Sequence, residues 1–311
     1  MIELRNLTKQ YGNKNVVNNI SLHIHPGVVT GFLGPNGAGK TTTMRMILGL
    51  AAPTAGNILI DKKAYASLKN PLYKIGAMMD TNAIDARLTA WQHLAVIAAA
   101  AGINSGRVEE VLLLTGLREA ANKKIREFSF GMKQRLGIAA ALLGNPETVM
   151  MDEPFNGLDI EGIHWLRSLL QDLAKQGKAV LVSSHLLSEV QEVADRVIVL
   201  ARGELIADMD MEEMQKESFH TYVQVASSNT PMLKKVLDKR GAKTDQVESG
   251  FLYVRKMDAR KIGELAFENG ICIYELTNYR PSLEQLFSEL VDGKTDYKGL
   301  ELNSLKHSYR T

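Results

Sequence analysis

The chain has 311 residues, 45% of them apolar, and its 37 basic and 35 acidic side chains leave a formal net charge of +2. This composition excludes a globally disordered chain, and the balanced charge argues against a protein that coats nucleic acid. The one cysteine, Cys272, excludes an internal disulfide, and its isoleucine neighbours predict a buried structural thiol.

No stretch of the chain approaches the roughly 20 apolar residues that a membrane-spanning helix needs. The first residues carry charge at alternate positions and lack the apolar core of a signal peptide. We therefore expect a cytosolic chain that reaches a membrane only through a partner.

Residues 1–215 are predicted to form one α/β domain, in which short apolar strands alternate with helices. Near its start, Tyr11 lies in a hairpin-like segment, where its ring could stack on a base or simply lie at the surface. Five apolar runs then have the pattern of a largely parallel sheet: residues 28–33, 75–79, 148–151, 179–183 and 197–200.

The most informative segment follows the first of these apolar runs. It has the pattern G-x-x-x-x-G-K-[ST], formed by Gly34, Pro35, Asn36, Gly37, Ala38, Gly39, Lys40 and Thr41. The glycines let backbone N–H groups turn toward phosphate oxygens, Lys40 would reach the β- and γ-phosphates, and the Thr41 hydroxyl would bind Mg²⁺. A helix is predicted to begin at Thr42, and its N-terminus favours an anion. Strand, loop and helix together predict a nucleotide phosphate site.

Further along the chain, residues 128–135 precede a helix predicted over residues 136–143. Ser129 and Gly131 at a helix start can present a hydroxyl and N–H groups to a phosphate. Ser129 can equally cap its own helix, and the spacing does not decide between these interpretations.

Two neighbouring strands end in polar side chains. The strand over residues 148–151 leads into Asp152, which suits Mg²⁺, and Glu153, which can orient or deprotonate an attacking water. Asn156 to Asp159 follow directly. The strand over residues 180–184 ends in His185, which could contact a γ-phosphate.

A second unit is predicted to begin near Phe219. Its elements have the order β-α-β-β-α-β, which is the split β-α-β or ferredoxin-like pattern. A further helix is predicted near Pro281, followed by a polar, mobile tail. The predicted division is an ATP-binding-type domain over residues 1–215, a small domain over residues 216–292 and a tail over residues 293–311.

Taken in order, the motifs of residues 1–210 resemble the Walker A, signature, Walker B, D-loop and H-loop segments of an ABC-type ATPase. The strings FSFGMKQRLGIA and MMDEPFNGLD are similar to the bacitracin and lantibiotic-immunity branch of peptide and drug exporters. The resemblance implies an α/β fold: a P-loop ATPase domain with a RecA-like core and a helical subdomain. The C-terminal unit resembles the small accessory α+β domain of drug-export ATPases.

The resemblance also implies roles for individual residues. Lys40, Glu153 and His185 would act in catalysis, and Thr41, Asp152 and Asp80 would hold Mg²⁺. ATP would contact Tyr11, residues 34–42, and the group formed by Ser129, Gly131 and Asp159. Three residues depart from the family pattern: Phe130 replaces a glycine, Met132 replaces a glutamine, and Asp80 replaces a glutamine or glutamate.

The partners implied by the resemblance are a second copy of the chain and a membrane permease. Two chains would pair head to tail, so that Ser129 and Gly131 of one cover the ATP bound at Lys40 of the other. Residues 80–91 would touch the permease, through which a peptide antibiotic, a drug or a similar amphiphile would be exported. No nucleic-acid partner is expected.

Three other functions are less well supported by the sequence. A soluble ABC-type ATPase that acts on ribosomes or DNA usually needs two fused nucleotide domains or a coiled-coil insert. A GTPase would want Asn-Lys-x-Asp, but the run from Asn122 to Ile125 lacks the aspartate. A regulatory module without turnover would not need Glu153 and His185.

Overall fold

The computed structural model describes residues 1–80, 84–184, 187–216, 222–246 and 251–279. Contacts divide this part of the chain into two compact units, the first ending at Met211 and the second beginning at Glu212. Both this boundary and the predicted one after residue 215 lie in the short helix α8 (Met211–Lys216). No helix within the described ranges is long and apolar enough to cross a membrane. The helix predicted near Pro281 and the tail over residues 293–311 lie outside these ranges.

The first unit opens with a three-stranded antiparallel sheet. Its order is β2-β1-β4, with β1 over Ile2–Tyr11, β2 over Lys14–Ile24 and β4 over Ala55–Ile60. Strands β1 and β2 form the predicted hairpin, whose turn contains Gly12 at φ +55°. Leu4, Ile20 and Ile60 from the three strands are buried in one cluster, so this sheet presents one face to a core.

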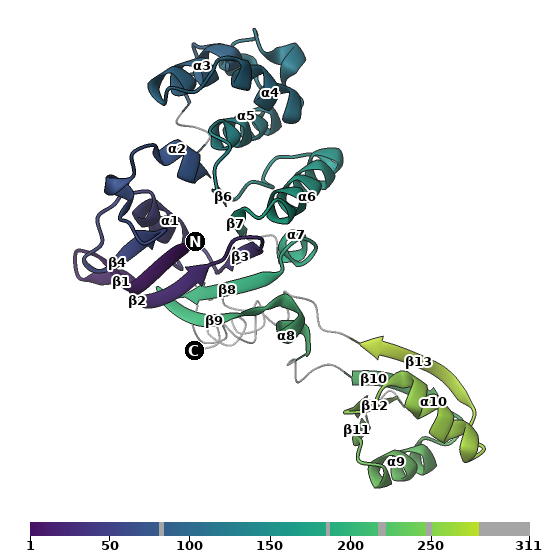
Figure 1. Cartoon of the computed structure of the whole chain (residues 1–311). Helices are drawn as coiled ribbons and strands as arrows, with labels where there is room; N and C mark the ends of the chain where they lie inside the picture. Colours follow the sequence, from purple (N-terminus) through teal and green to yellow (C-terminus); the bar gives the residue numbers. More distant parts are fainter. Residues whose placement is uncertain (81–83, 185–186, 217–221, 247–250, 280–311) are drawn as a thin grey trace, which may run out of the picture. The chain divides into compact units, whose positions relative to one another are not determined.

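A six-stranded sheet of order β5-β6-β7-β3-β8-β9 forms the centre of the unit (Figure 1). All its pairs are parallel except β8 with β9. The strands are β3 (Val29–Leu33), β5 (Ile75–Met78), β6 (Thr148–Asp152), β7 (Ala179–Ser184), β8 (Arg196–Ala201) and β9 (Glu204–Asp210). Because β3, β6 and β7 run in parallel, their carboxyl ends meet at one edge, where ligands of open α/β sheets bind.

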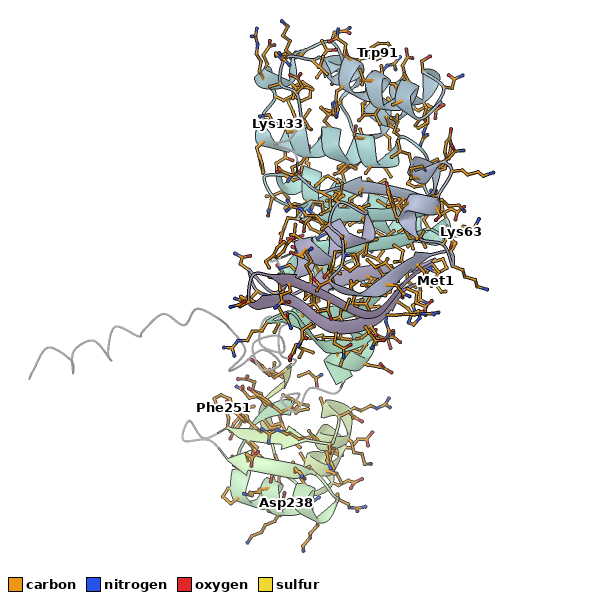
Figure 2. The ribbon with its side chains drawn as sticks, turned by 90° about the vertical axis from the view of Figure 1, so that its left-hand side faces the viewer. Met1, Lys63, Trp91, Lys133, Asp238 and Phe251 are labelled. Atoms are coloured by element: carbon orange, nitrogen blue, oxygen red, sulfur yellow. The ribbon has the colours of Figure 1, made fainter. Side chains whose placement is uncertain are left out.

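Helices cover both faces of this sheet, and α3, α4 and α5 gather into a separate helical group (Figure 1). Successive residues of β6 belong to different cores: Val149 and Met151 pack with the helical group and α6, while Met150 packs with α1 and the N-terminal sheet. Figure 2 shows Trp91 of α3 at the opposite end of this unit from Met1. The helices are α1 (Lys40–Ile47), α2 (Pro71–Lys74), α3 (Ala90–Ala100), α4 (Gly106–Leu114), α5 (Phe130–Leu142), α6 (Ile160–Lys175) and α7 (Leu187–Gln191), with short 3₁₀ turns at Tyr65–Ser67, Arg118–Ala120 and Ile125–Glu127.

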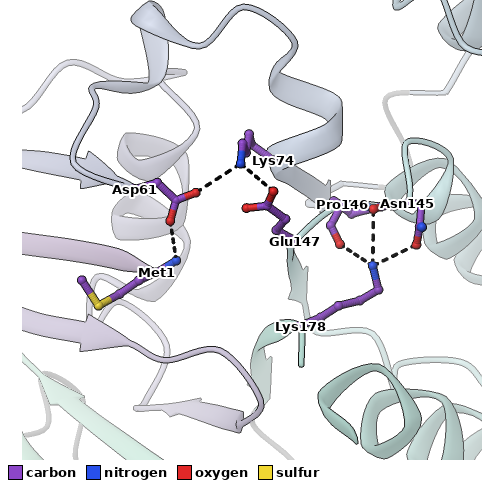
Figure 3. A network of polar contacts seen from close by, with 7 residues as sticks. All are labelled: Met1, Asp61, Lys74, Asn145, Pro146, Glu147 and Lys178. Atoms are coloured by element: carbon purple, nitrogen blue, oxygen red, sulfur yellow. Dashed lines mark hydrogen bonds and ion pairs between the residues drawn. The ribbon is translucent and has the colours of Figure 1, made fainter. Parts of the chain in front are cut away.

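A polar network ties the amino ends of β6 and β7 to the N-terminal sheet (Figure 3). The Lys74 ammonium lies 2.5 Å from Glu147, just before β6, and 3.5 Å from Asp61, just after β4. Lys178, just before β7, donates to the Asn145 side chain at 2.8 Å. Exposed pairs of this kind each stabilise a fold by about 0–1 kcal/mol. The network lies at the sheet edge opposite to the carboxyl ends of β6 and β7.

The second unit is a four-stranded antiparallel sheet with two helices, in the predicted order β-α-β-β-α-β. The sheet order is β11-β12-β10-β13, so β12 inserts between β10 and β11, as in a split β-α-β arrangement. Val225, Leu237, Val254 and Ile262 are fully buried between sheet and helices. Its elements are β10 (Tyr222–Ser227), α9 (Thr230–Lys239), β11 (Lys243–Gln246), β12 (Leu252–Arg255), α10 (Ala259–Glu268) and β13 (Ile273–Tyr279).

The prediction of a buried thiol at Cys272 is wrong, because this side chain is exposed. Its backbone is held on both sides by Ser228: the Cys272 N–H donates to Ser228 Oγ at 3.1 Å, and the Ser228 N–H donates to the Cys272 carbonyl at 2.9 Å. Ile271 takes the interior position. Adjacent residues of an extended segment point to opposite sides, so the thiol faces outward.

Candidate functional site at the carboxyl ends of β3, β6 and β7

The predicted phosphate-binding loop connects β3 to α1, as the sequence pattern requires. Gly34 and Gly39 have no room for a side chain: an added Cβ would lie 2.5 Å from the Leu200 carbonyl oxygen and 2.6 Å from the Val16 carbonyl oxygen, respectively. Gly39 also has φ +102° and is the N-cap of α1. Asn36 and Gly37 at the tip are exposed, whereas Ala38 is buried. The loop is therefore fixed at its two ends and open at its tip.

Lys40, the first residue of α1, turns into the loop. Its side chain is only 7% exposed, and its ammonium donates to the carbonyl oxygens of Gly34 at 2.6 Å and Pro35 at 3.4 Å. Burial lowers the pKa of Lys40, while the carboxylates of Glu153 and Asp152 oppose this shift. The amine and the two carboxylates are thus close enough to influence one another.

Asp152 is held by hydroxyl groups on both of its oxygens. The Thr41 hydroxyl donates to Asp152 Oδ2 at 2.7 Å, and the Ser183 hydroxyl donates to Oδ1. Thr41 and Asp152 thereby bring two hard oxygen donors together at the end of β6, a set that fits Mg²⁺, which binds one or two protein oxygens and completes its shell with phosphate and water. No group of three or more histidine, cysteine or acidic residues suited to a metal occurs in the described ranges.

Glu153 has an unusual backbone conformation, with φ +53° in the left-handed region. This region costs a residue with a side chain about 1–2 kcal/mol. The Glu153 N–H donates to the Ser183 carbonyl at 3.2 Å and to Ser183 Oγ at 3.0 Å, and its carbonyl accepts a 3.5 Å contact from Gln134 of α5. Neighbouring elements therefore stabilise the turn that directs the Glu153 side chain.

Sequence reasoning missed Ser183. At the end of β7 the sequence analysis singled out only His185, which lies outside the described residues. The available signal was register: β6 and β7 are both short, apolar, parallel-sheet strands ending in polar residues, and their pairing sets Asp152 opposite Ser183. Strand alignment rather than any motif brings these two residues together.

At the start of α5, Ser129 is an N-cap: its Oγ accepts from the Met132 N–H at 3.2 Å. The capping interpretation is therefore confirmed, and because Ser129 is also exposed, its hydroxyl remains accessible to a ligand. Phe130, the departure from the family pattern, packs its ring over Gly157, where an added Cβ would lie 1.9 Å from a ring carbon. Gly131 approaches the same loop, with an added Cβ 2.8 Å from the Gly157 carbonyl oxygen. The segments 129–131 and 156–159 thus form one packed unit.

Asp159 caps the next helix, since its carboxylate accepts from the Gly162 N–H at 2.9 Å at the start of α6. Arg135 of α5 reaches the same helix, with its guanidinium 4.5 Å from the centre of the Trp165 ring. A cation over an aromatic face contributes about 0.5–1 kcal/mol at exposed sites. These contacts orient α5 and α6 relative to each other.

Two predicted site residues lie at the periphery. Tyr11, at the end of β1, is 54% exposed, and its ring lies 4.9 Å from the Lys9 ammonium. Asp80 is exposed and follows β5, which pairs with β6 at the edge of the sheet. The structure therefore groups Lys40, Thr41 and the Asp152–Glu153 pair, and leaves Tyr11 and Asp80 at the surface.

Comparison with known proteins agrees with this arrangement. Residues 17–156 match the family model described as ABC transporter, and residues 221–284 match one described as a domain of unknown function (DUF8746). The chain is 37% identical over 300 residues to the bacitracin transport ATP-binding protein BcrA of Enterococcus faecalis, covering 94% of this chain and 97% of BcrA. It is 33% identical over 225 residues to the lantibiotic transport ATP-binding protein SrtF of Streptococcus pyogenes, covering 72% of this chain and 97% of SrtF.

Solved structures show the same fold. The dimeric structure of MJ0796, described as a bacterial ABC transporter cassette, is 28% identical with a TM-score of 0.63, and the match covers 68% of this chain and 99% of that one. An ATP-binding subunit of an ABC transporter is also 28% identical, with a TM-score of 0.64 and coverage of 70% and 92%. The chain therefore belongs to the ATP-binding proteins of the ABC transporter family and is an ATPase of that family.

Proposed function

We propose that this chain is the ATP-hydrolysing subunit of an exporter that moves a peptide antibiotic, a drug or a similar amphiphile through a separate membrane permease. The observation that carries this proposal is the meeting of Lys40, Thr41, Asp152 and Glu153 at the carboxyl ends of β3 and β6. The names of the relatives BcrA and SrtF supply the substrate class, since they are bacitracin and lantibiotic transport proteins.

In the proposed site, backbone N–H groups of residues 34–42 hold the phosphates of ATP at the N-terminus of α1. Lys40 exchanges its carbonyl partners for β- and γ-phosphate oxygens. Thr41 and Asp152 would hold Mg²⁺, with Asp80 contributing through a water, and the bound ion would supply positive charge beside the β- and γ-phosphates. Tyr11 stacks on the base.

Hydrolysis requires a water aligned with the γ-phosphorus. The Glu153 carboxylate accepts a proton from this water as its oxygen bonds to phosphorus and the bond to the β-phosphate oxygen breaks, giving ADP and phosphate. His185 contacts the γ-phosphate in this scheme. A left-handed Glu153 held by Ser183 gives the base a fixed direction, which supports its assignment.

A second copy of the chain completes the site in this proposal. Ser129 and Gly131 of one copy cover the ATP bound to the other, with Asp159 close by. The accessible Ser129 hydroxyl and the dimeric cassette among the similar structures support it. ATP shifts the pair toward the closed state only as far as it binds that state more tightly than the open one.

The permease is proposed to dock beside α2 and α3. A cavity of about 410 Å³ between these helices is lined mainly by apolar side chains, including Leu72, Tyr73, Val96, Ile97 and Ala100. Tyr73 and Val96 in this lining are 41% and 62% exposed, so apolar side chains gather at the surface here, as they do at interaction sites. Helix α3 begins at Ala90, within residues 80–91, the segment expected to contact the permease.

The experiment that tests the site compares wild type with Glu153→Gln. We expect the variant to bind ATP, to lose hydrolysis because an amide cannot act as a base, and to form an ATP-dependent dimer in light scattering. Glu147→Gln, at the exposed amino end of β6, is the matched control and should behave as wild type. Wild-type turnover by Glu153→Gln, or a monomer at saturating ATP and Mg²⁺, would contradict the proposal.

A second experiment separates export from the rival of a soluble ABC-type ATPase. The chain is purified through a tag from detergent-solubilised membranes of its own cell, and its co-purifying proteins are identified. A polytopic membrane protein that raises the ATPase rate when reconstituted supports export. Ribosomal proteins or DNA-bound factors in its place would favour the rival.

A further inference from the structure

The side chain of Ser183 forms hydrogen bonds to both residues of the Asp152–Glu153 pair. It lies in β7, directly across the parallel pairing from Asp152, and its side chain is fully buried. Its position is therefore fixed by the pairing of β7 with β6 in the central sheet.

The hydroxyl of Ser183 donates one hydrogen bond and accepts another. It donates that proton to Asp152 Oδ1, and its oxygen accepts from the Glu153 N–H at 3.0 Å. Because Thr41 donates to the other oxygen of Asp152, the carboxylate is oriented from two sides. A hydroxyl can be donor and acceptor at once, which no apolar residue of this size can match.

The second of these bonds acts on the base. Glu153 has φ +53°, a conformation that a residue with a side chain adopts only when its surroundings hold it. Ser183 supplies two acceptors for the Glu153 N–H, its hydroxyl and its carbonyl oxygen at 3.2 Å. Removing the hydroxyl leaves the weaker of the two contacts to define the direction of the Glu153 side chain.

We propose that Ser183 is a positioning residue for ATP hydrolysis, which sets the metal-binding Asp152 and the general base Glu153 in a fixed mutual orientation. Ser183 touches neither ATP nor the attacking water, and it acts only through these two carboxylate residues. The inference rests on the proposed roles of Asp152 and Glu153.

The test compares Ser183→Ala, Ser183→Cys and Thr30→Val in the full chain. The thiol of Ser183→Cys keeps a weak donor and acceptor at a similar size. Thr30 lies in the neighbouring strand β3, is equally buried, and its hydroxyl has no hydrogen-bond partner, so Thr30→Val is the matched control for losing a buried hydroxyl. Readouts are kcat, KM for ATP, the Mg²⁺ concentration for half-maximal rate, and the unfolding temperature.

We expect Ser183→Ala to lower kcat by about tenfold to a hundredfold and to raise the Mg²⁺ requirement, while KM for ATP changes by less than about threefold. The kcat and Mg²⁺ requirement of Ser183→Cys should lie between those of Ser183→Ala and wild type, and those of Thr30→Val should equal the wild-type values. A kcat of Ser183→Ala equal to wild type overturns the inference, as does a loss of ATP binding in parallel with kcat. If Ser183→Ala does not fold, a folded Ser183→Cys with wild-type kcat and Mg²⁺ requirement overturns it.

The outcome for Glu153→Gln separates the two levels of the proposal. An inactive Glu153→Gln together with an unaffected Ser183→Ala contradicts the positioning role alone. An active Glu153→Gln contradicts the proposed site itself, whatever Ser183→Ala does.

Discussion

Lys40 is the residue on which nucleotide binding most depends. Its ammonium is buried among carbonyl oxygens and lies near two carboxylates, so it can exchange these partners for phosphate oxygens with little further loss of hydration. Lys40→Ala removes the charge, and we expect ATP affinity to fall below detection in a fluorescent-nucleotide titration because charge-assisted bonds to the γ-phosphate are lost.

The control for Lys40 is Lys178→Ala. Lys178 is likewise held by carbonyl oxygens (Figure 3), and burial lowers its pKa, but it lies at the amino end of β7, opposite to the carboxyl ends where the site lies. Its replacement should leave nucleotide binding intact. Normal binding by Lys40→Ala would contradict the assignment of the phosphate loop.

Asp80 is a proposed site residue at which the chain departs from the family pattern. It is exposed after β5, and its carboxylate has a shorter reach than the glutamine or glutamate found there in the family. If it contacts Mg²⁺ through a water, Asp80→Ala should lower permease-stimulated ATPase activity more than ATP binding. Asp80→Gln and Asp80→Glu should retain more activity than Ala. Equal stimulated rates in all four proteins would show that Asp80 has no part in coupling.

At the residue scale, the sequence motifs predicted which residues meet because their strands run in parallel in one sheet. They did not predict which residues meet because two paired strands are aligned residue by residue. Lys40 and Thr41 begin the helix that follows the β3 loop, and Asp152 ends β6, so the parallel order of these strands allowed their meeting to be predicted. The contact of Ser183 with Asp152 depends on a pairing alignment that no local pattern encodes. The left-handed φ of Glu153 is a tertiary effect, because its own side chain disfavours it.

At the scale of elements, the contact between the start of α5 and the loop before α6 can be tested directly. Gly157 has φ +70° and lies under the Phe130 ring, so Gly157→Ala meets both backbone strain and a clash. We expect a loss of about 1–3 kcal/mol in the free energy of unfolding, measured by denaturant titration.

The matched control is Gly177→Ala, because Gly177 has a similar φ of +83° but open space around its missing Cβ. The difference between the two variants isolates the Phe130 contact. In the double variant Phe130→Ala with Gly157→Ala, part of the loss should be recovered. Equal losses for Gly157→Ala and Gly177→Ala would show that the ring contact has no energetic effect.

Most elements were predictable because their apolar periodicity is strong, but helix starts were not. Helices predicted from Thr42 and from residue 136 begin earlier, at Lys40 and Phe130. In both cases a capping residue, Gly39 or Ser129, begins the helix within the motif itself. The first residue of a helix is set by its cap and by the loop before it. The motif residues at these two helix starts are polar, so apolar spacing does not reveal where the helix begins.

At the scale of the whole molecule, the two units have separate buried clusters, and this predicts two unfolding transitions. Mg²⁺-ATP at about 100 times its Kd should stabilise the first unit by about 2.7 kcal/mol and leave the transition of the second unchanged. Leu237→Ala, in the core of the second unit, should cost that unit about 2–5 kcal/mol. Calorimetry of the wild-type protein and of Leu237→Ala, each with and without Mg²⁺-ATP, measures the stabilisation of the first unit and the destabilisation of the second.

An outcome with a single transition, moved by ATP and by Leu237→Ala alike, would contradict independent unfolding. The division of the chain predicted from the sequence also depends on this result. Apolar periodicity predicted the order of elements in the second unit. The boundary between the units lies within α8, and its exact position depends on whether a residue packs in the core of the first unit or of the second.

The pairing of Asp152 with Ser183 has a consequence for how the length of this chain can change. One residue inserted or deleted within β7 would turn every later side chain of that strand to the opposite face, and the serine hydroxyl would leave the carboxylate. Surface turns with open space, such as those at Gly102 and Gly241, carry no such constraint. Peptide tags and labels belong at these turns, whereas the count of residues within β7 must be preserved even where its composition is changed.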